Sequence, residues 1–331
     1  MKKGLLIVAL AALLALSAAA CGGDDDGEPA GGGGGEAQES YDITLLQGVR
    51  GDEFYITMAC GAQEAADELN VNLTVQGPDE FDPAQQIPIL NGIIAEQPDA
   101  LLIAPTDTKA LIAPMQQAKD AGITVVEVDT TVEQEDISVS KIATDNVEGG
   151  RVAARALAEL IGGEGAVLVV NVNPGISTTD QRQQGFEEEI EKSPNVEYLG
   201  TEFSNNEPAR AASIVSATLA AERNLRGIFG TNLFSAEGAA TGLRNAGAQD
   251  RVSIVGFDAG PAQVEQLRDD LVQALVAQKP ADIGRMGIEQ AVNALQDEQV
   301  EPEIKTDLVT VTQENVDDPE IANEVLYKAD C

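Results

Sequence analysis

The chain has 331 residues, of which 56 are acidic and 20 are basic, and its formal net charge at pH 7 is −36. Because this charge repels phosphate groups, nucleic acid and anionic lipid surfaces are poor partners. Histidine is absent, which excludes Ser-His-Asp and Cys-His nucleophile systems, histidine zinc sites and histidine pH switches. Most hydrolase mechanisms therefore lack their usual base.

Residues 1–20 have the pattern of an export signal. Lysines at positions 2 and 3 precede an apolar run, Leu5–Leu16, that is too short to span a bilayer, and small residues follow it. The stretch that ends at Cys21 resembles a bacterial lipobox, in which the cysteine is diacylated and becomes the new N-terminus, although Ala18 stands where leucine is commonest. Because residues 18–20 also form an A-x-A site, the alternative is plain secretion with Cys21 as a free thiol.

Residues 21–40 predict a lipidated cysteine followed by a flexible linker, because they are acidic and glycine-rich with almost no apolar content. The roughly 290 residues that follow exceed what one hydrophobic core usually serves, so we expect two lobes. No later segment approaches about 18 consecutive apolar residues, the length that spans a bilayer. We therefore expect an extracytoplasmic protein, in the periplasm or on the outer face of the cytoplasmic membrane, that meets the membrane only through its N-terminal lipid.

From Tyr41 onward, short β-branched runs alternate with segments of helical period, as in the βαβ units of a parallel sheet. The first half is predicted to hold strands at 43–49, 73–76, 100–104 and 124–129, helices at 56–69, 84–96 and 109–121, and a crossing segment at 138–144. The second half is predicted to hold helices at 147–161, 181–191, 209–223, 236–245, 262–269 and 281–295, and strands at 166–171, 197–203, 227–231, 253–257, 272–277 and 306–311. This alternation predicts an α/β protein with two similar doubly wound parallel-sheet lobes.

Short polar side chains and one aromatic pair follow the predicted strands. Ligands of open parallel sheets gather outside these carboxyl ends. The residues at the junctions are Asp52, Phe54, Tyr55, Asp107, Asp129, Asp145, Asn146, 173–180, Asn205, Asn206, Asn232, Asp258 and Gln278. The alternative for each polar residue is an N-cap of the next helix, and at any one position the two interpretations weigh equally.

Two features favour a ligand site over capping. Phe54 and Tyr55 are adjacent in a chain with only 7 phenylalanines, 4 tyrosines and no tryptophan, and they fall at the start of a helix rather than within a strand. Asn206 and Gln278 are not needed as caps. Because planar amides and carboxylates grip vicinal hydroxyls while aromatic faces cover sugar C–H groups, the set predicts a carbohydrate site.

Cys60 and Cys331 are the only cysteines besides Cys21. An exported protein meets a setting that permits disulfides, so the two form either one bridge or two separate thiols. The bridge is favoured because a cysteine at the last position has little packing value.

Six motifs then occur in the order in which one family carries them. They are Phe54-Tyr55 with Gly61-Ala62-Gln63; Ala104-Pro105-Thr106-Asp107; Ala143-Thr144-Asp145-Asn146 with Gly149-Gly150; Arg182 with Gly185-Phe186; Ile254-Val255-Gly256-Phe257-Asp258; and Ala277-Gln278. With them, residues 42–312 resemble the ribose-binding type (type I) of periplasmic solute-binding protein of sugar ABC transporters, whose lobes also occur in the lac-repressor family. The resemblance implies a three-crossing hinge between lobes of 41–143 plus 279–306 and 144–278 plus 307–331, a monomer, and no cofactor.

The resemblance also implies a set of ligand contacts, with aromatic rings against the sugar faces and polar groups on its hydroxyls. The ligand-binding residues predicted in this way and from the strand ends are Asp52, Phe54, Tyr55, Asp129, Thr130, Asp180, Asn206, Asn232, Asp258 and Gln278. Arg182 matches an arginine of the family that we interpret as structural. No metal site is predicted.

Three positions depart from the pentose receptors of this type. Those receptors carry arginine at the positions of Thr130 and Asp180, and Leu233 replaces a residue that is usually acidic. Because an acceptor replaces a donor at position 180, the hydrogen-bond polarity of the site changes. A polyol or a monosaccharide of different configuration is therefore a better candidate than ribose.

We therefore expect a substrate-binding lipoprotein that captures a small neutral carbohydrate and delivers it to the permease subunits of an ABC importer without catalysing a reaction. The main alternative is a receptor for a non-sugar, such as a nucleoside or a furanone signal, that feeds a sensor. A transcription regulator would need an N-terminal helix-turn-helix, where residues 1–40 hold a signal and a linker. A further alternative is an extracytoplasmic enzyme that uses Asp180 and Asp258 as an acid–base pair.

Overall fold

The computed structural model describes residues 40–331, which form two lobes, each built on a six-stranded sheet. The predicted export signal, Cys21 and the linker as far as residue 39 lie outside the described residues. Within residues 40–331, no helix is both long enough and apolar enough to cross a membrane. The same residues contain no group of three or more cysteine or acidic side chains that could hold a metal ion.

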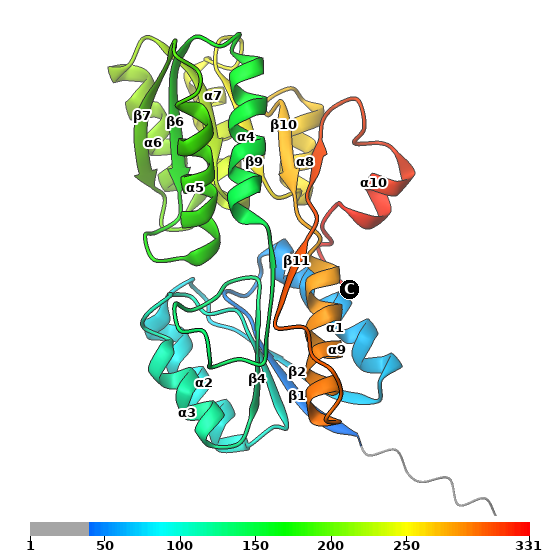
Figure 1. Ribbon diagram of the computed structural model, residues 1–331. Helices are drawn as coiled ribbons and strands as arrows, with labels where there is room; N and C mark the ends of the chain where they lie inside the picture. Colours follow the sequence, from blue (N-terminus) through cyan, green and yellow to red (C-terminus); the bar gives the residue numbers. More distant parts are fainter. Residues whose placement is uncertain (1–39) are drawn as a thin grey trace, which may run out of the picture. The chain divides into compact units, whose positions relative to one another are not determined.

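The first lobe carries a fully parallel sheet with the strand order β11-β5-β4-β3-β1-β2. Its strands are β1 (Tyr41–Leu46), β2 (Val71–Gln76), β3 (Ala100–Ile103), β4 (Thr124–Val128), β5 (Ser140–Thr144) and β11 (Glu303–Thr306). Helices α1 (Glu53–Glu68) and α9 (Pro280–Leu295) pack on one face, and α2 (Pro83–Glu96) and α3 (Ile112–Asp120) lie on the other (Figure 1). Neighbouring strand residues such as Leu101 and Leu102 belong to different hydrophobic clusters, one on each face.

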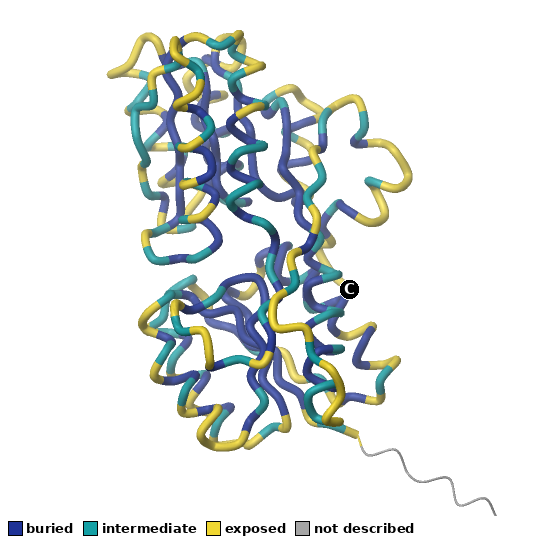
Figure 2. Tube along the Cα trace, in the orientation of Figure 1, coloured by how far each residue is buried: buried dark blue, intermediate teal, exposed yellow. Residues whose placement is uncertain are grey.

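The second lobe repeats this plan with the strand order β12-β10-β9-β8-β6-β7, in which only β12 is antiparallel to its neighbour. Its strands are β6 (Gly165–Asn171), β7 (Val196–Phe203), β8 (Leu225–Gly230), β9 (Ser253–Phe257), β10 (Ala274–Ala277) and β12 (Val309–Val311). Its helices are α4 (Asn146–Leu160), α5 (Ser177–Ile190), α6 (Pro208–Ala221), α7 (Leu233–Ala246), α8 (Pro261–Arg268) and α10 (Pro319–Glu324). Figure 2 shows that the central strands of both sheets are largely buried.

The chain passes between the lobes from β5 to α4, from β10 to α9 and from β11 to β12. The predicted fold of two doubly wound parallel-sheet lobes with a three-crossing hinge is therefore confirmed. The single strand predicted at 306–311 is wrong. That run is divided between β11 and β12, which belong to different sheets, because the third crossing interrupts it.

Glycines let two helices of the second lobe approach backbone to backbone. A Cβ at Gly150 of α4 would lie 2.0 Å from the carbonyl oxygen of Arg182 on α5, and a Cβ at Gly185 of α5 would lie 1.9 Å from the carbonyl oxygen of Val147. Since no real side chain fits at such a distance, the crossing of α4 and α5 depends on both glycines. It also fixes the position of Arg182 relative to the sheet.

Replacing Gly150 by alanine should lower the free energy of unfolding by about 1–3 kcal/mol, the usual cost of overpacking a close-packed contact. Urea unfolding measures the change. The matched control is Gly92→Ala in α2, where an added Cβ meets nothing within 4 Å. An alanine at an exposed helical site should stabilise the protein by up to about 1 kcal/mol. Equal stability of the two variants would contradict the packing described here.

Candidate functional site

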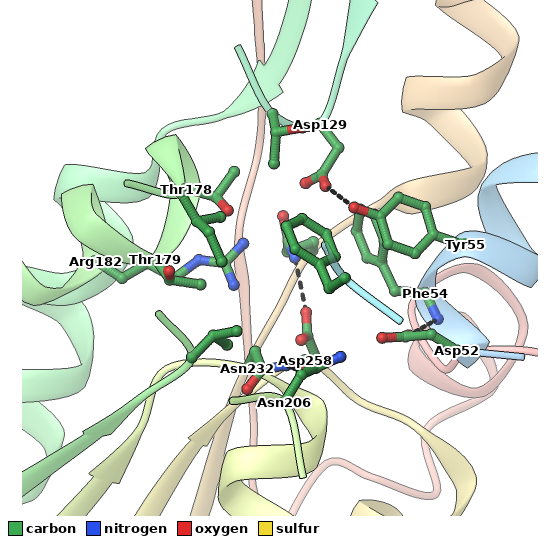
Figure 3. Close-up of a pocket in the computed structure, with 15 residues that line it drawn as sticks. Asp52, Phe54, Tyr55, Asp129, Thr178, Thr179, Arg182, Asn206, Asn232 and Asp258 are labelled. Atoms are coloured by element: carbon green, nitrogen blue, oxygen red, sulfur yellow. Dashed lines mark hydrogen bonds between the residues drawn. The ribbon is translucent and has the colours of Figure 1, made fainter. Parts of the chain in front are cut away.

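A pocket lies between the two lobes, at the carboxyl ends of the strands, and residues of both lobes line it (Figure 3). The first lobe contributes Asp52, Phe54, Tyr55, Phe81, Asp129 and Thr130; the second contributes Val172, Ile176, Thr178, Thr179, Arg182, Asn206, Asn232 and Asp258, and Gln278 follows β10 at a crossing. This is the place where open parallel sheets bind ligands.

The start of α1 places two aromatic rings and a carboxylate on one wall of the pocket. Asp52 caps α1, and its Oδ1 accepts the N–H of Phe54 at 2.9 Å. Phe54 and Tyr55 meet edge to face with ring centroids 5.1 Å apart. The Tyr55 hydroxyl donates to Oδ2 of Asp129 at 2.7 Å, and the ring of Phe81 stacks on Tyr55 at a centroid distance of 6.5 Å. The wall thus presents apolar ring surface beside two carboxylate acceptors.

On the second lobe, a carboxylate is held by three donors. Oδ2 of Asp258 accepts the backbone N–H of Leu233, the first residue of α7, at 2.9 Å. Its Oδ1 accepts from Nε2 of Gln278 at 2.7 Å and from the hydroxyl of Tyr327 at 2.9 Å. Nδ2 of Asn232 donates to Oδ1 of Asn206 at 2.6 Å. These hydrogen bonds already hold the side chains in place, so ligand binding costs less side-chain entropy.

Asp129 and Asp258 occupy equivalent places in the two lobes. Asp129 directly follows β4 and Asp258 directly follows β9, and both have a left-handed backbone, with φ of 64° and 79°. Aspartate and asparagine adopt this conformation more readily than other residues with side chains, because their short polar groups bond locally. Figure 3 shows both carboxylates pointing into the pocket.

Arg182 is the only cation among the described residues that line the pocket. Its Nε donates to Oδ1 of Asn146 at 2.8 Å, and its Nη1 donates to the carbonyl oxygen of Thr231 at 2.9 Å. The guanidinium carbon lies 3.7 Å from the centre of the Phe257 ring, in a cation–π contact. Figure 3 shows the guanidinium pointing into the pocket. In addition to the structural role interpreted from the sequence, Arg182 therefore offers a donor to a ligand.

Two buried hydroxyls of the pocket, Oγ1 of Thr130 and Oγ1 of Thr179, have no hydrogen-bond partner in the described part of the chain. Their residues are 1% and 4% exposed. An unpaired buried polar group costs about 1–3 kcal/mol, and native structures contain few of them. Since one hydroxyl comes from each lobe, a polar ligand that contacts both lobes removes this cost.

The pocket contains three carboxylates and one guanidinium. Burial is the main cause that raises the pKa of Asp52 well above its ordinary value, and the nearby charge of Asp258 raises it further. Burial also raises the pKa of Asp129 to about 6, although the charge of Arg182 lowers it in part. Because the pocket is richer in acceptors than in donors, it favours a ligand that supplies hydroxyl donors.

Replacing Asp129 by asparagine should stabilise the unliganded protein at pH 7.5 and leave it nearly unchanged at pH 4. The native pKa of about 6 exceeds the ordinary value of 3.8, so the unfolded chain releases the proton first and the native state loses stability as the pH rises from about 4 to about 6. At neutral pH, the free energy of unfolding of the variant should exceed that of the wild type by up to about 3 kcal/mol. Asparagine keeps an acceptor for Tyr55 and tolerates the left-handed backbone. Urea unfolding at both pH values checks this, and a variant that is less stable than the wild type at pH 7.5 would contradict it.

Nine of the ten predicted ligand-binding residues line the pocket, and Asp180 does not. Oδ2 of Asp180 accepts the N–H of Gly175 at 2.8 Å, and the side chain lines a second, larger cavity. Asp180 follows Thr179 in the first turn of α5, where successive side chains are rotated by about 100°. The acid–base pair of Asp180 and Asp258 loses its support for the same reason.

Six further residues line the pocket without having been assigned to it: Phe81, Val172, Ile176, Thr178, Thr179 and Arg182. The hydroxyl run from Ser177 to Thr179, within the junction 173–180, was a usable signal for the threonines. Phe81 lies in the loop before α2, where no motif marks it.

The lobes also contact each other directly beside the pocket. The N–H of Thr108 on the first lobe donates to the carbonyl oxygen of Gly175 on the second at 2.9 Å. The N–H of Thr131 donates to Oγ of Ser177, one residue before Thr178, at 2.8 Å. Both bonds join one lobe to the other, so they can form only while the lobes are in contact beside the pocket.

The model of the periplasmic binding protein domain family matches residues 43–299. The D-ribose/D-allose-binding protein of Pseudomonas aeruginosa is 32% identical, over 78% of this chain and 84% of that protein. The ribose import binding protein of Salmonella typhimurium is 29% identical, over 82% of this chain and 90% of that protein.

Solved structures agree with these relatives. An ABC transporter solute-binding protein from Agrobacterium vitis, bound with α-D-tagatopyranose, is 41% identical with a TM-score of 0.85, covering 87% of this chain and 99% of that one. A second protein of this kind from the same organism, with bound D-fucose, is 30% identical with a TM-score of 0.83, covering 86% of this chain and 100% of that one. The chain therefore belongs to the periplasmic binding protein domain family, and within it to the ribose-binding type that its six sequence motifs predicted.

Proposed function

We propose that this protein captures a monosaccharide or polyol between its lobes and delivers it to the permease of an ABC importer. The observation that carries the proposal is the pocket, in which rings, carboxylates, amides and two unpartnered threonine hydroxyls converge from both lobes. The rings suit the apolar faces of a sugar, and the polar groups suit its hydroxyls. The ligand leaves chemically unchanged, so the protein acts as a receptor rather than as an enzyme.

The ligand class follows from the relatives and from the polar groups of the pocket. Two relatives are named for ribose or allose, and two solved structures hold tagatose and fucose. We favour a neutral hexose or a polyol over ribose, because Thr130 lines the pocket where pentose receptors carry arginine, and Asp180, at the second such position, lies outside the pocket and supplies no donor to it. The excess of acceptors in the pocket also suits a ligand with many hydroxyl donors.

Ligand binding acts by closing the lobes. A ligand that bonds Thr130 on the first lobe and Thr179 on the second makes both contacts only in the closed state, so it favours that state by its differential affinity. The bonds from Thr108 and Thr131 to the second lobe belong to the same state. The closed form is then the one that docks on the permease.

We also propose that the protein works outside the cytoplasmic membrane, as a monomer held there by a lipid on Cys21. The support is the sequence of residues 1–40, which combines a signal pattern, a lipobox-like stretch and a flexible linker. Mass spectrometry of the mature N-terminus tests the anchor. A diacylated Cys21 supports it, and an unmodified N-terminus there selects plain secretion.

Isothermal titration calorimetry against a ligand panel tests the binding function. The panel holds tagatose, fucose, allose, galactose, ribose and arabinose, two hexitols, and two nucleosides as the non-sugar arm. We expect one neutral hexose or polyol to bind with a Kd well below about 1 mM. If no neutral carbohydrate binds in that range, the proposal fails, and a nucleoside that binds selects the alternative receptor.

Replacing Thr179 by valine should weaken binding of that ligand by about 3–10-fold, because one neutral hydrogen bond contributes about 0.5–1.5 kcal/mol. The free protein should be slightly more stable, since the variant removes an unpaired buried hydroxyl. The matched control is Thr218→Val, whose hydroxyl bonds the Ile214 carbonyl on α6 outside the pocket. Calorimetry measures both affinities, and equal values would contradict a contact between Thr179 and the ligand.

A further inference from the structure

The last residues of the chain run from the second lobe back to the first. After α10, the N–H of Tyr327 donates to the carbonyl oxygen of Ala259 on the second lobe at 3.0 Å. One residue later, the N–H of Lys328 donates to Oγ1 of Thr57 on α1 of the first lobe at 2.8 Å. A disulfide then joins Cys331 to Cys60, also on α1. The C-terminal segment, residues 325–331, is thus a further connection between the lobes, and a covalent bond closes it.

Tyr327 sits within this segment and contacts both walls of the pocket. Its hydroxyl donates to Oδ1 of Asp258 at 2.9 Å and accepts the backbone N–H of Gln278 at 3.3 Å. Its ring meets the ring of Phe54 edge to face, with centroids 5.9 Å apart. Tyr327 is 5% exposed and is not one of the residues that line the pocket. It therefore supports two pocket residues, one on each lobe, from behind.

The disulfide is the main attachment of the segment beyond Tyr327. Residues 328–331 are all exposed. Besides the bond to Thr57, they are held by an ion pair of 3.7 Å between Lys328 and Glu64, whose side chains are about half exposed. Exposed ion pairs contribute little, and chain ends without buried contacts fray. Without the bridge, the segment that carries Tyr327 loses its covalent anchor on α1 and keeps only these weaker contacts.

We propose that Tyr327 is a positioning residue of the sugar site and that the Cys60–Cys331 disulfide holds it in place. The segment thereby acts as a fourth connection between the lobes, and its integrity sets the affinity for the ligand. Tyr327 provides one of the three donors that orient Asp258 and fixes the edge of Phe54. The effect on affinity rests on the proposed binding function, whereas the coupling between disulfide and Tyr327 does not.

The first experiment measures affinity by calorimetry in the full chain carrying Cys21→Ser, which removes the third cysteine. Tyr327→Phe keeps the ring against Phe54 and removes one hydrogen bond to a carboxylate, so we expect binding about 10-fold weaker. Cys331→Ser should also weaken binding. In the Tyr327→Ala background, Cys331→Ser should cause no further loss, because both changes act through the same side chain. A purely structural role of the disulfide would instead give additive losses.

The control for the hydroxyl is Tyr198→Phe. The Tyr198 hydroxyl bonds Glu187 at 2.8 Å, away from the pocket, so its removal should leave the affinity unchanged. Thermal melts show that each variant is folded. Wild-type affinity in both Tyr327→Phe and Cys331→Ser overturns the proposal.

The second experiment needs no ligand. The chain has four tyrosines and no tryptophan, so fluorotyrosine labelling gives four fluorine resonances, which single Tyr-to-Phe variants assign. We expect Cys331→Ser, or reduction of the wild type, to shift or broaden the Tyr327 resonance while that of Tyr198 stays in place. An unmoved Tyr327 resonance overturns the proposal. If no sugar binds the wild type, the proposed function fails, and the fluorine spectrum still decides the coupling.

Discussion

Replacing Arg182 by methionine should cause a large loss of sugar binding, with the Kd rising by about 10–150-fold. Arg182 is the only cation that lines the pocket in residues 40–331, and a hydrogen bond from a charged group contributes about 1.5–3 kcal/mol. Its loss also leaves Asp52, Asp129 and Asp258 without a cationic neighbour. The pKa of Asp129, which Arg182 lowers, should then rise further. Calorimetry at pH 7.5 with the best ligand of the panel measures the loss.

The matched control is Arg151→Met. Arg151 lies on α4 and pairs with Glu188 at 2.6 Å in a partly exposed ion pair, so its removal should change affinity by less than about threefold. Because Arg182→Met also loses the bonds to Asn146 and Thr231, a thermal melt must show that it is folded. Arg182→Lys is the second variant, since it keeps the charge but not the forked geometry. Wild-type affinity in Arg182→Met would remove Arg182 from the binding site.

Reduction of the disulfide should lower the free energy of unfolding by about 4 kcal/mol, because the bridge closes a very long loop in the unfolded chain. Cys60 and Cys331 are 271 residues apart, and the bridge restricts almost the whole described chain. In the folded state the change is confined to the C-terminal segment that carries Tyr327, because the bridge joins only that segment to α1. Equilibrium urea unfolding with and without a phosphine reductant measures the difference.

The control for this experiment is the Cys60→Ser variant. In the Cys21→Ser background, it keeps a single thiol, so the reductant should not change its unfolding curve. Its stability without reductant should equal that of the reduced parent protein. A reductant that leaves the parent protein unchanged would show that Cys60 and Cys331 are not bonded in solution.

Much of the fold could be predicted from sequence because parallel strands buried on both faces are nearly continuous apolar runs. The strand predicted at 253–257 coincides with β9, and the strand predicted at 166–171 lies within β6. The position of the pocket then followed from topology, since the carboxyl ends of parallel strands meet at one edge. Asp129 and Asp258 could be assigned to it because each directly follows a strand.

Contacts that depend on where a helix begins could not be predicted as well. The helix after β6 was predicted to begin at residue 181, but α5 begins at Ser177. With the later start, Asp180 would be a loop residue free to reach the pocket. In the structure, helical rotation brings Thr179 to the pocket instead. An error of four residues in the predicted start of the helix therefore placed the carboxylate of Asp180 in the pocket instead of the hydroxyl of Thr179.

Tyr327 was beyond the reach of sequence patterns for another reason. It contacts Asp258, 69 residues earlier in the chain, and the polar tail around it has neither the strand nor the helix period. Only the path of the chain after β12 brings it behind the pocket. The position of Cys331 indicated a disulfide, but it gave no indication that the disulfide would hold Tyr327 in place.

The left-handed backbone of Asp129 and Asp258 limits which substitutions at these two positions can change the ligand preference of the receptor. At φ of 64° and 79°, nearly all replacements strain the main chain, and only asparagine and glycine fit as readily as aspartate. Each is one nucleotide change away from an aspartate codon. Asparagine exchanges a charged acceptor for an amide that also donates, and glycine deletes the contact. A library of nine combinations at these two codons therefore covers the ligand preferences that natural drift can reach there without rebuilding the strand ends.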